Sequence, residues 1–131
     1  MVKHKLFLDT NAVIHFNMAD DSEKFNRVAD LLICRECHVP IEVIAEAVFV
    51  LEKAFALDRQ IIADKLKDFI RFQENLVPET NVVLYGLNLY AATDFDIIDC
   101  LLDGYAKING VTVFTFDGDL RKQLGSQLFH D

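Results

Sequence analysis

Residues 113–119 read VFTFDGD, an apolar run that passes directly into an aspartate, a glycine and a second aspartate. Residues 5–9, KLFLD, show the same pattern near the start of the chain. Because β-branched and aromatic residues favour strands, we predict a strand in each place, over residues 5–8 and 111–116. Both predicted strands therefore end at a carboxylate.

The rest of the chain alternates helical apolar periodicity with turn and capping residues. Helices interleaved with short strands indicate an α/β domain with a mostly parallel sheet. The chain has 131 residues and no linker-like segment, so we expect residues 1–131 to form one domain. Helices are expected after Asp9, from Ser22 to Cys34, from Pro40 to about Phe55, from Asp58, from Asn81, from Ile97 to Ile108 and from Asp119, with a very short strand at Val39. Ser22, Asp58 and Asp119 are the expected caps of their helices, and Asn109 with Gly110 should stop the helix that begins at Ile97. Two apolar stripes are expected: Phe25, Val28, Ala29 and Leu32 on the helix from Ser22, and Ile62, Leu66, Phe69 and Ile70 on the helix from Asp58.

The net charge of the chain limits the kinds of molecule that its surface can attract. Thirteen basic against 21 acidic residues give a net charge of −8, the wrong sign for a surface that attracts nucleic acid as a whole. A polyanionic partner would need a local basic patch or a metal ion. No segment approaches the roughly 20 apolar residues of a membrane span, and Asp9 interrupts the first apolar run too early for a signal peptide. We therefore expect a cytoplasmic protein without a membrane partner.

Two of the three cysteines lie in the sequence CRECH, residues 34–38. The spacing matches covalent haem attachment and also half of a zinc site. Haem attachment of this kind needs an exported chain, and structural zinc needs two further ligands, whereas Cys100 lies far away in the sequence. We favour ordinary buried thiols at a helix end, Cys34 and Cys37, over a cofactor site.

Asp9 and Asp117 follow the two predicted strands. The simpler explanation for Asp9 is a helix cap, because aspartate accepts hydrogen bonds from free backbone N–H groups. For Asp117 it is an Asp-Gly turn before a helix that Asp119 caps. In open α/β sheets, however, ligands bind beyond the carboxyl ends of the strands. We therefore expect both carboxylates to lie at one edge of the sheet.

Glu46 is the only charged residue in VIAEAVFVL, residues 43–51. A helix that is apolar on nearly every side is expected to be largely buried. An ionised glutamate there costs several kcal/mol unless something compensates it. The alternative is an ion pair with Lys53 at the helix edge.

Asp96 and Asp99 lie three residues apart at the start of a predicted helix, so both can face one space. Asp96 is in the position of a cap. Asp99 lies between two isoleucines and the sequence CLL, and is the better candidate for an inward acid.

Four carboxylates in one pocket, those of Asp9, Glu46, Asp99 and Asp117, would take up protons unless a divalent cation held them ionised. Oxygen ligands suit Mg²⁺ or Mn²⁺ and disfavour zinc. Such a cation generally holds phosphate oxygens and activates water, so phosphodiester hydrolysis is the natural chemistry. Glu46 is the candidate general base because of its expected burial, and Arg121 and Lys122 are the basic residues expected to contact the phosphate groups of the substrate.

Four segments occur in a characteristic order: FLDTNAVI (7–14), VPIEVIAEAVFVLE (39–52), DIIDCLL (96–102) and VFTFDGDL (113–120). In this order, and in a chain of this length, they resemble a PIN domain, and specifically the VapC-type ribonuclease toxins of bacterial and archaeal toxin–antitoxin pairs. The similarity covers essentially the whole chain.

The resemblance implies a three-layer α/β/α fold whose short, mostly parallel central sheet has four or five strands. It also implies an endoribonuclease that depends on Mg²⁺ or Mn²⁺ and acts on an RNA substrate. Proteins of this kind commonly form homodimers, and a small antitoxin protein silences them by inserting its tail into the acidic site.

The resemblance assigns roles to particular residues. The acidic quartet maps onto Asp9, Glu46, Asp99 and Asp117. Asn11 and Thr115 match positions that support the quartet by hydrogen bonds. Asp119 matches an auxiliary metal or water ligand, and Asp96 a weaker one.

Other functions stay open. The chain could be an RNA-processing or decay nuclease without an antitoxin, or a PIN-like module that binds RNA or protein without cutting it. The intact quartet is evidence against the second, since little but a metal offsets its charge. A phosphatase of the haloacid dehalogenase type needs an aspartate two positions after the first, where this chain has Asn11.

Overall fold

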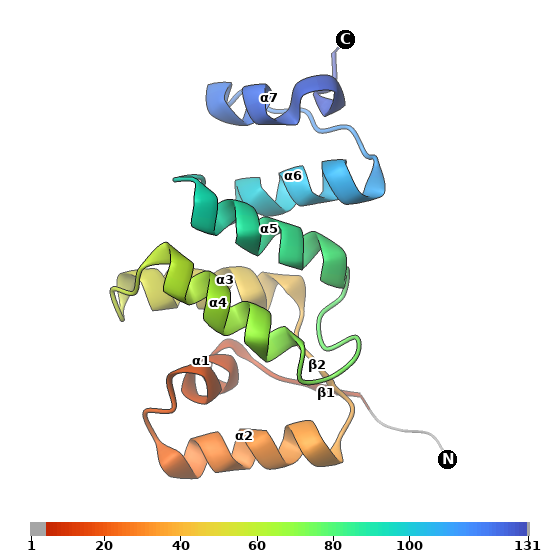
Figure 1. Cartoon of the computed structure of the whole chain (residues 1–131). Coiled ribbons are helices and arrows are strands. Elements are labelled where there is room, and N and C mark those ends of the chain that lie inside the picture. Colours follow the sequence, from red (N-terminus) through yellow and green to blue (C-terminus); the bar gives the residue numbers. More distant parts are fainter. Residues whose placement is uncertain (1–4, 131) are drawn as a thin grey trace. The chain divides into compact units, whose positions relative to one another are not determined.

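The computed structural model describes residues 5–130, and the chain divides into two compact units, residues 1–80 and 81–131 (Figure 1). One domain over residues 1–131 stays a prediction. Unit 1 contains β1 (Leu6–Phe7), α1 (Thr10–Met18), α2 (Ser22–Cys34), β2 (Cys37–His38), α3 (Ile41–Lys53) and α4 (Arg59–Ile70). Unit 2 contains α5 (Thr80–Ala92), which begins at the last residue of unit 1, followed by α6 (Ile97–Asn109), α7 (Gly118–Leu124) and the 3₁₀ helix η1 (Gly125–Gln127).

The sheet of unit 1 is short and parallel. β1 pairs with β2, with Leu6 opposite Cys37 and Phe7 opposite His38. The strand predicted at Val39 lies one residue earlier, and the Val39 N–H donates to the carbonyl oxygen of Leu76 at 2.7 Å. Over residues 5–130 the structure is therefore a mostly helical α/β protein with a two-stranded parallel sheet. The predicted sheet of four or five strands is not shown.

The strand predicted over residues 111–116 does not form. Only Val113 pairs, in an isolated parallel bridge with Leu128. Its N–H donates to the carbonyl oxygen of Gln127 at 2.9 Å, and its own carbonyl accepts from the N–H of Phe129 at 2.8 Å. β-Propensity reports which side chains fit a pleated surface, whereas a strand also needs a partner along its length. In unit 2, residues 127–129 provide that partner only at Val113.

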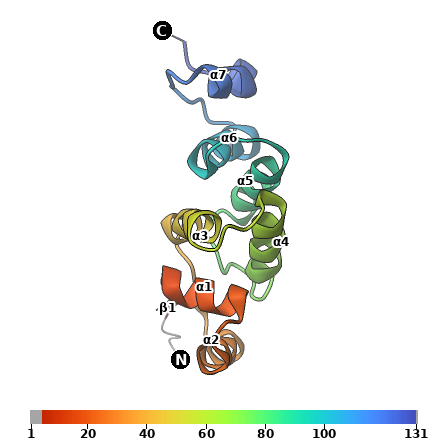
Figure 2. The same ribbon diagram turned by 90° about the vertical axis from the view of Figure 1, so that its left-hand side faces the viewer.

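In unit 1, α1 lies between α2 and α3 (Figure 2). The predicted apolar stripe of α2 faces inward: Val28 and Leu32 are buried, and Phe25 and Ala29 are half-buried. The cap of this helix is Asp21 and not Ser22 as predicted, because the Asp21 carboxylate accepts from the N–H of Lys24 at 3.1 Å. The helix boundary was thus predicted correctly and its cap was misplaced by one residue.

Helices α3 and α4 bury apolar stripes in unit 1. The stripe predicted for α4 is confirmed, since Ile62, Leu66, Phe69 and Ile70 are all buried. Asp58 stands at the N-cap of α4, but its side chain forms no capping hydrogen bond, contrary to the prediction. The α3 helix ends at Lys53, two residues before the predicted end at Phe55, and α5 begins one residue before the predicted start at Asn81.

Glycines let α5 and α6 approach closely in unit 2. A Cβ atom at Gly104 would lie 2.9 Å from the carbonyl oxygen of Val82, so any larger residue there would force the helices apart. Gly110 ends α6 in the left-handed conformation, with φ of 71°, as predicted. An apolar cluster of unit 2, to which α7 contributes two leucines, consists of Ala106, Val113, Leu120, Leu124 and Leu128. No helix in the described part of the chain is long and apolar enough to cross a membrane.

Candidate active site

Asp9 connects β1 to α1 in unit 1. It is exposed and stands at the N-cap of α1, where its Oδ1 accepts from the N–H of Ala12 at 3.0 Å. The capping interpretation is therefore confirmed for Asp9. Capping occupies one carboxylate oxygen, so it does not prevent the other from binding a ligand.

Glu46 is exposed, contrary to the predicted burial. At helical spacing it shares one exposed stripe of α3 with Glu42 and Phe49, while Ala45 and Ala47 beside it are buried. The apolar residues next to Glu46 therefore lie on the other faces of the helix, and this stripe is exposed to solvent. Burial no longer supports Glu46 as the general base, and any such role must depend on its accessibility instead.

Asp96 and Asp99 behave as their positions predicted. Asp96 is exposed and caps α6, accepting from the N–H of Ile98 at 2.7 Å. Asp99 is half-buried in the first turn of the same helix. Burial raises the pKa of Asp99, and the negative charges of Asp117 and Asp96 raise it further. Three carboxylates of unit 2 are therefore close enough to interact.

Asp117 caps α7. Its Oδ1 accepts from the N–H of Leu120 at 2.8 Å, so Asp119, which was predicted to be the cap, instead lies exposed in the first turn. The Asp117 N–H donates to Oγ1 of Thr115 at 3.1 Å. Arg121 donates from Nη1 to the carbonyl oxygen of Thr115 at 3.0 Å. Thr115 thus orients the backbone of Asp117, and Arg121 is partly engaged in holding the same turn.

The carboxylates of Asp99 and Asp117 lie close enough in unit 2 for the charge of Asp117 to raise the pKa of Asp99, and both offer only oxygen atoms as ligands. A divalent cation would relieve the repulsion between them, so hard Mg²⁺ or Mn²⁺ fits these residues. Among residues 5–130, no group of three or more His, Cys, Asp or Glu side chains within either unit lies close enough together to hold an ion. The convergence of Asp9 and Glu46 with Asp99 and Asp117 stays a prediction.

Asn11 lies exposed in the first turn of α1. It lines a cavity of about 270 Å³ together with His15, Lys24 and Arg27. His15 hydrogen-bonds through Nδ1 to Asp20 at 2.9 Å, and this hydrogen bond lowers the pKa of Asp20. The support of the quartet by Asn11 stays a prediction.

The thiols of Cys34 and Cys37 lie in different environments. Cys34 is exposed at the end of α2, so its predicted burial is wrong. Cys37 is buried in β2, where its Sγ donates to the carbonyl oxygen of Leu31 at 3.4 Å. Burial raises the pKa of the Cys37 thiol, which keeps it protonated and unreactive near neutral pH.

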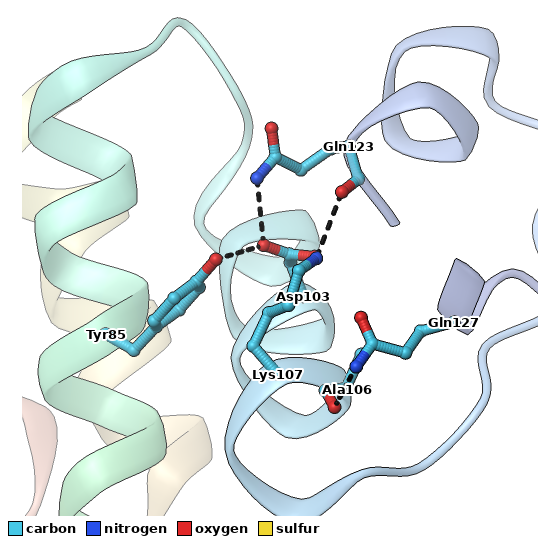
Figure 3. Close-up of polar contacts among 6 residues, drawn as sticks. All are labelled: Tyr85, Asp103, Ala106, Lys107, Gln123 and Gln127. Carbon is cyan, nitrogen blue, oxygen red and sulfur yellow. Dashed lines mark hydrogen bonds and ion pairs between the residues drawn. The ribbon is translucent and has the colours of Figure 1, made fainter. Parts of the chain in front are cut away.

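The sequence reasoning missed a buried carboxylate, that of Asp103 in α6 (Figure 3). Its partners are Tyr85, Lys107 and Gln123, which come from α5, α6 and α7. One signal was available in the sequence, because Asp103 and Lys107 have the i,i+4 spacing of a helical ion pair. The other two partners are distant in the sequence and only the fold reveals them.

We predict that Asp99→Asn stabilises the protein at neutral pH when no divalent cation is present. An acid whose pKa is raised by folding binds protons more tightly in the folded state, so its contribution to stability falls as the pH rises above the ordinary value of 3.8. Removing the charge should raise the melting temperature at pH 7 by a few degrees at most, and by less near pH 4. Thermal unfolding in excess chelator measures this difference.

The exposed Asp94→Asn serves as the control for this experiment and should show no such pH-dependent difference. A stabilisation by Asp99→Asn that grows as the pH falls would contradict the electrostatic interpretation.

Comparison with known protein families matches residues 6–123 of the chain to the PIN domain. The match includes most of both compact units and all eight residues of the candidate site. In the same comparisons, neither a curated protein nor a solved structure matched the chain.

Proposed function

Because the chain belongs to the PIN domain family, whose members are generally nucleases, we propose that it is a metal-dependent endoribonuclease. The observation that carries this proposal is the match of residues 6–123 to the PIN domain, and the influence of the Asp117 charge on Asp99 in unit 2 agrees with it. Their mutual repulsion is unfavourable for folding, and a bound divalent cation would reverse it.

In this proposal Asp9, Glu46, Asp99 and Asp117 hold Mg²⁺ or Mn²⁺ through their carboxylate oxygens. The bound cation would polarise the scissile phosphate and lower the pKa of an attacking water. Thr115 keeps Asp117 in place through the hydrogen bond to its backbone N–H. Asp96 and Asp119, both exposed, are auxiliary ligands of metal or water.

Glu46 is the proposed general base. Because its side chain is exposed, its carboxylate oxygens are accessible to water and substrate. The water oxygen forms the new bond to phosphorus, its proton moves to Glu46, and the bond from phosphorus to the leaving ribose oxygen breaks. Lys122, exposed on α7 beside Arg121, is the proposed contact for the RNA backbone.

The proposal also includes the more specific features that the resemblance to VapC-type toxins implies. They are the three-layer α/β/α fold with four or five strands, the VapC-type toxin role, a homodimer, a cytoplasmic location and a cognate antitoxin. The net charge of −8 suits an antitoxin with a basic tail. A nuclease of RNA processing or decay would need the same catalytic residues and no antitoxin.

A circular single-stranded RNA tests the activity, because it has no ends for an exonuclease to use. We expect the purified protein with Mn²⁺ to convert the circle to a linear product of the same length before shorter fragments accumulate. A circular DNA of the same sequence measures the preference for RNA. An RNA circle that stays intact while linear RNA is shortened from one end would refute the endonuclease assignment.

A binding module without catalysis is the second candidate, and one observation favours it. Asp9, Asp96 and Asp117 each cap a helix, so capping alone can account for three of the acids. Calorimetric titration with Mn²⁺ separates the two candidates. Millimolar or tighter binding supports the nuclease, and its absence supports the binding module.

A further inference from the structure

Asp103 is a fully buried acid whose role the nuclease chemistry does not explain. It lies one helical turn after Asp99 in α6, and its side chain has no exposed surface. A buried carboxylate is tolerated only when hydrogen bonds and opposite charge compensate it. The arrangement of its partners therefore indicates what the carboxylate does.

Three donors surround the Asp103 carboxylate (Figure 3). Oδ2 accepts from the hydroxyl of Tyr85 at 2.6 Å and from Nε2 of Gln123 at 3.1 Å. Oδ1 accepts from Nζ of Lys107 at 2.7 Å. Burial and the neighbouring carboxylate raise the pKa of Tyr85 to about 12, so its hydroxyl remains a donor at neutral pH. The carboxylate is thus fully satisfied by donors from α5, α6 and α7.

Gln123 connects α7 to this network at two points. Its side chain donates to Asp103, and its backbone carbonyl accepts from Nζ of Lys107 at 3.0 Å. Lys107 therefore bridges the carboxylate on α6 and the backbone of α7. A short helix of seven residues has little stability of its own, so such contacts decide where it lies.

Both helices in this network carry a quartet acid near their N-terminal ends. Asp99 precedes Asp103 by four residues in α6, which is about 6 Å along the helix axis. Asp117 caps α7, six residues before Gln123, which is about 9 Å along that axis. Fixing Gln123 on Asp103 therefore limits how far Asp117 can move from Asp99.

We propose that Asp103 is a positioning residue, whose buried carboxylate binds α7 to α6 through Gln123 and Lys107 and so keeps the Asp117 carboxylate beside Asp99. Its effect on catalysis rests on the proposed nuclease function, whereas its effect on the position of α7 does not.

Gln123→Leu is the sharpest test, because it removes one donor and leaves Asp103 paired with Tyr85 and Lys107. The matched control is Gln127→Leu, which removes a hydrogen bond of equal length, 3.1 Å, from the same residue type to the carbonyl oxygen of Ala106 in α6. Amide hydrogen exchange of residues 121–124 reports the attachment of α7. We expect about tenfold faster exchange in Gln123→Leu, with residues 121–124 unchanged in Gln127→Leu and the helices of unit 1 unchanged in both.

Cleavage of RNA in Mn²⁺ provides the second readout. We expect Gln123→Leu to lower kcat about 10- to 100-fold while leaving KM for RNA within about twofold, because the displaced acid acts on the reaction rather than on RNA binding. Lys107→Met should have the same effect. Lys107→Arg should restore kcat relative to Lys107→Met, since a guanidinium can donate to both Asp103 and Gln123.

The two readouts separate the possible failures. Unchanged exchange of residues 121–124 in Gln123→Leu would overturn the attachment of α7 through Asp103, whether or not the protein cuts RNA. Faster exchange with unchanged kcat would overturn the positioning role. If the wild-type protein does not cut RNA at all, the proposed function fails, while faster exchange in Gln123→Leu still establishes the attachment.

Discussion

Asp9→Asn should reduce RNA cleavage by about a thousandfold or more and leave the fold intact. A cation that stabilises the transition state by several kcal/mol is lost when a charged ligand becomes neutral, and each 1.4 kcal/mol or so corresponds to a factor of ten in rate. Asparagine caps helices about as well as aspartate, so the bond to the Ala12 N–H is expected to persist. Asp117→Asn, at the cap of α7, should behave in the same way. The rate of cleavage and the far-ultraviolet circular dichroism spectrum measure the two parts of this prediction.

Asp21→Asn is the matched control for Asp9→Asn. Asp21 caps α2 through the N–H of Lys24 at 3.1 Å, so it has the same capping chemistry and belongs to no part of the proposed site. We expect wild-type cleavage from this variant. Full activity in Asp9→Asn or in Asp117→Asn would remove the metal mechanism, because either carboxylate would then serve only as a cap.

Removal of divalent cations should abolish cleavage of the circular RNA completely. The donor atoms of the quartet are all carboxylate oxygens, which bind hard cations weakly enough for a chelator to compete. After treatment with excess EDTA and dialysis, we expect no linear product. Addition of Mg²⁺ or Mn²⁺ at millimolar concentration should restore the activity.

Zinc is the comparison for this experiment. Histidine and thiolate ligands favour zinc, and neither occurs in the predicted quartet, so Zn²⁺ should restore little activity. Undiminished cleavage in excess EDTA would show that any RNA hydrolysis by this protein does not depend on these carboxylates acting through a metal.

The local features of the fold could be predicted from the sequence with good accuracy. The α2 and α6 helices lie where their periodicity places them, and Gly110 ends α6 in the left-handed conformation. Asp96 was correctly predicted as a cap and Asp99 as the more buried acid of the pair. These features depend on residues within one or two helical turns of one another, and so the sequence alone contains the information.

The errors concern interactions between distant segments. The strand expected over residues 111–116 lacks a partner except at Val113. Glu46, in the most apolar stretch of the chain, lies on the exposed stripe of α3. In both cases the local pattern was read correctly, but pairing and burial are decided by which other segments come near.

The sequence by itself determined the family, through four short acidic motifs in order, and the positions of the helices, through apolar period and capping. Only the tertiary structure decided which carboxylates interact. It brings Asp117 close enough to raise the pKa of Asp99, and it surrounds Asp103 with donors from α5, α6 and α7. The reason is that helix periodicity and capping act over a few residues of chain, whereas the energy of a carboxylate depends on every charge and donor that packing places within a few ångströms of it.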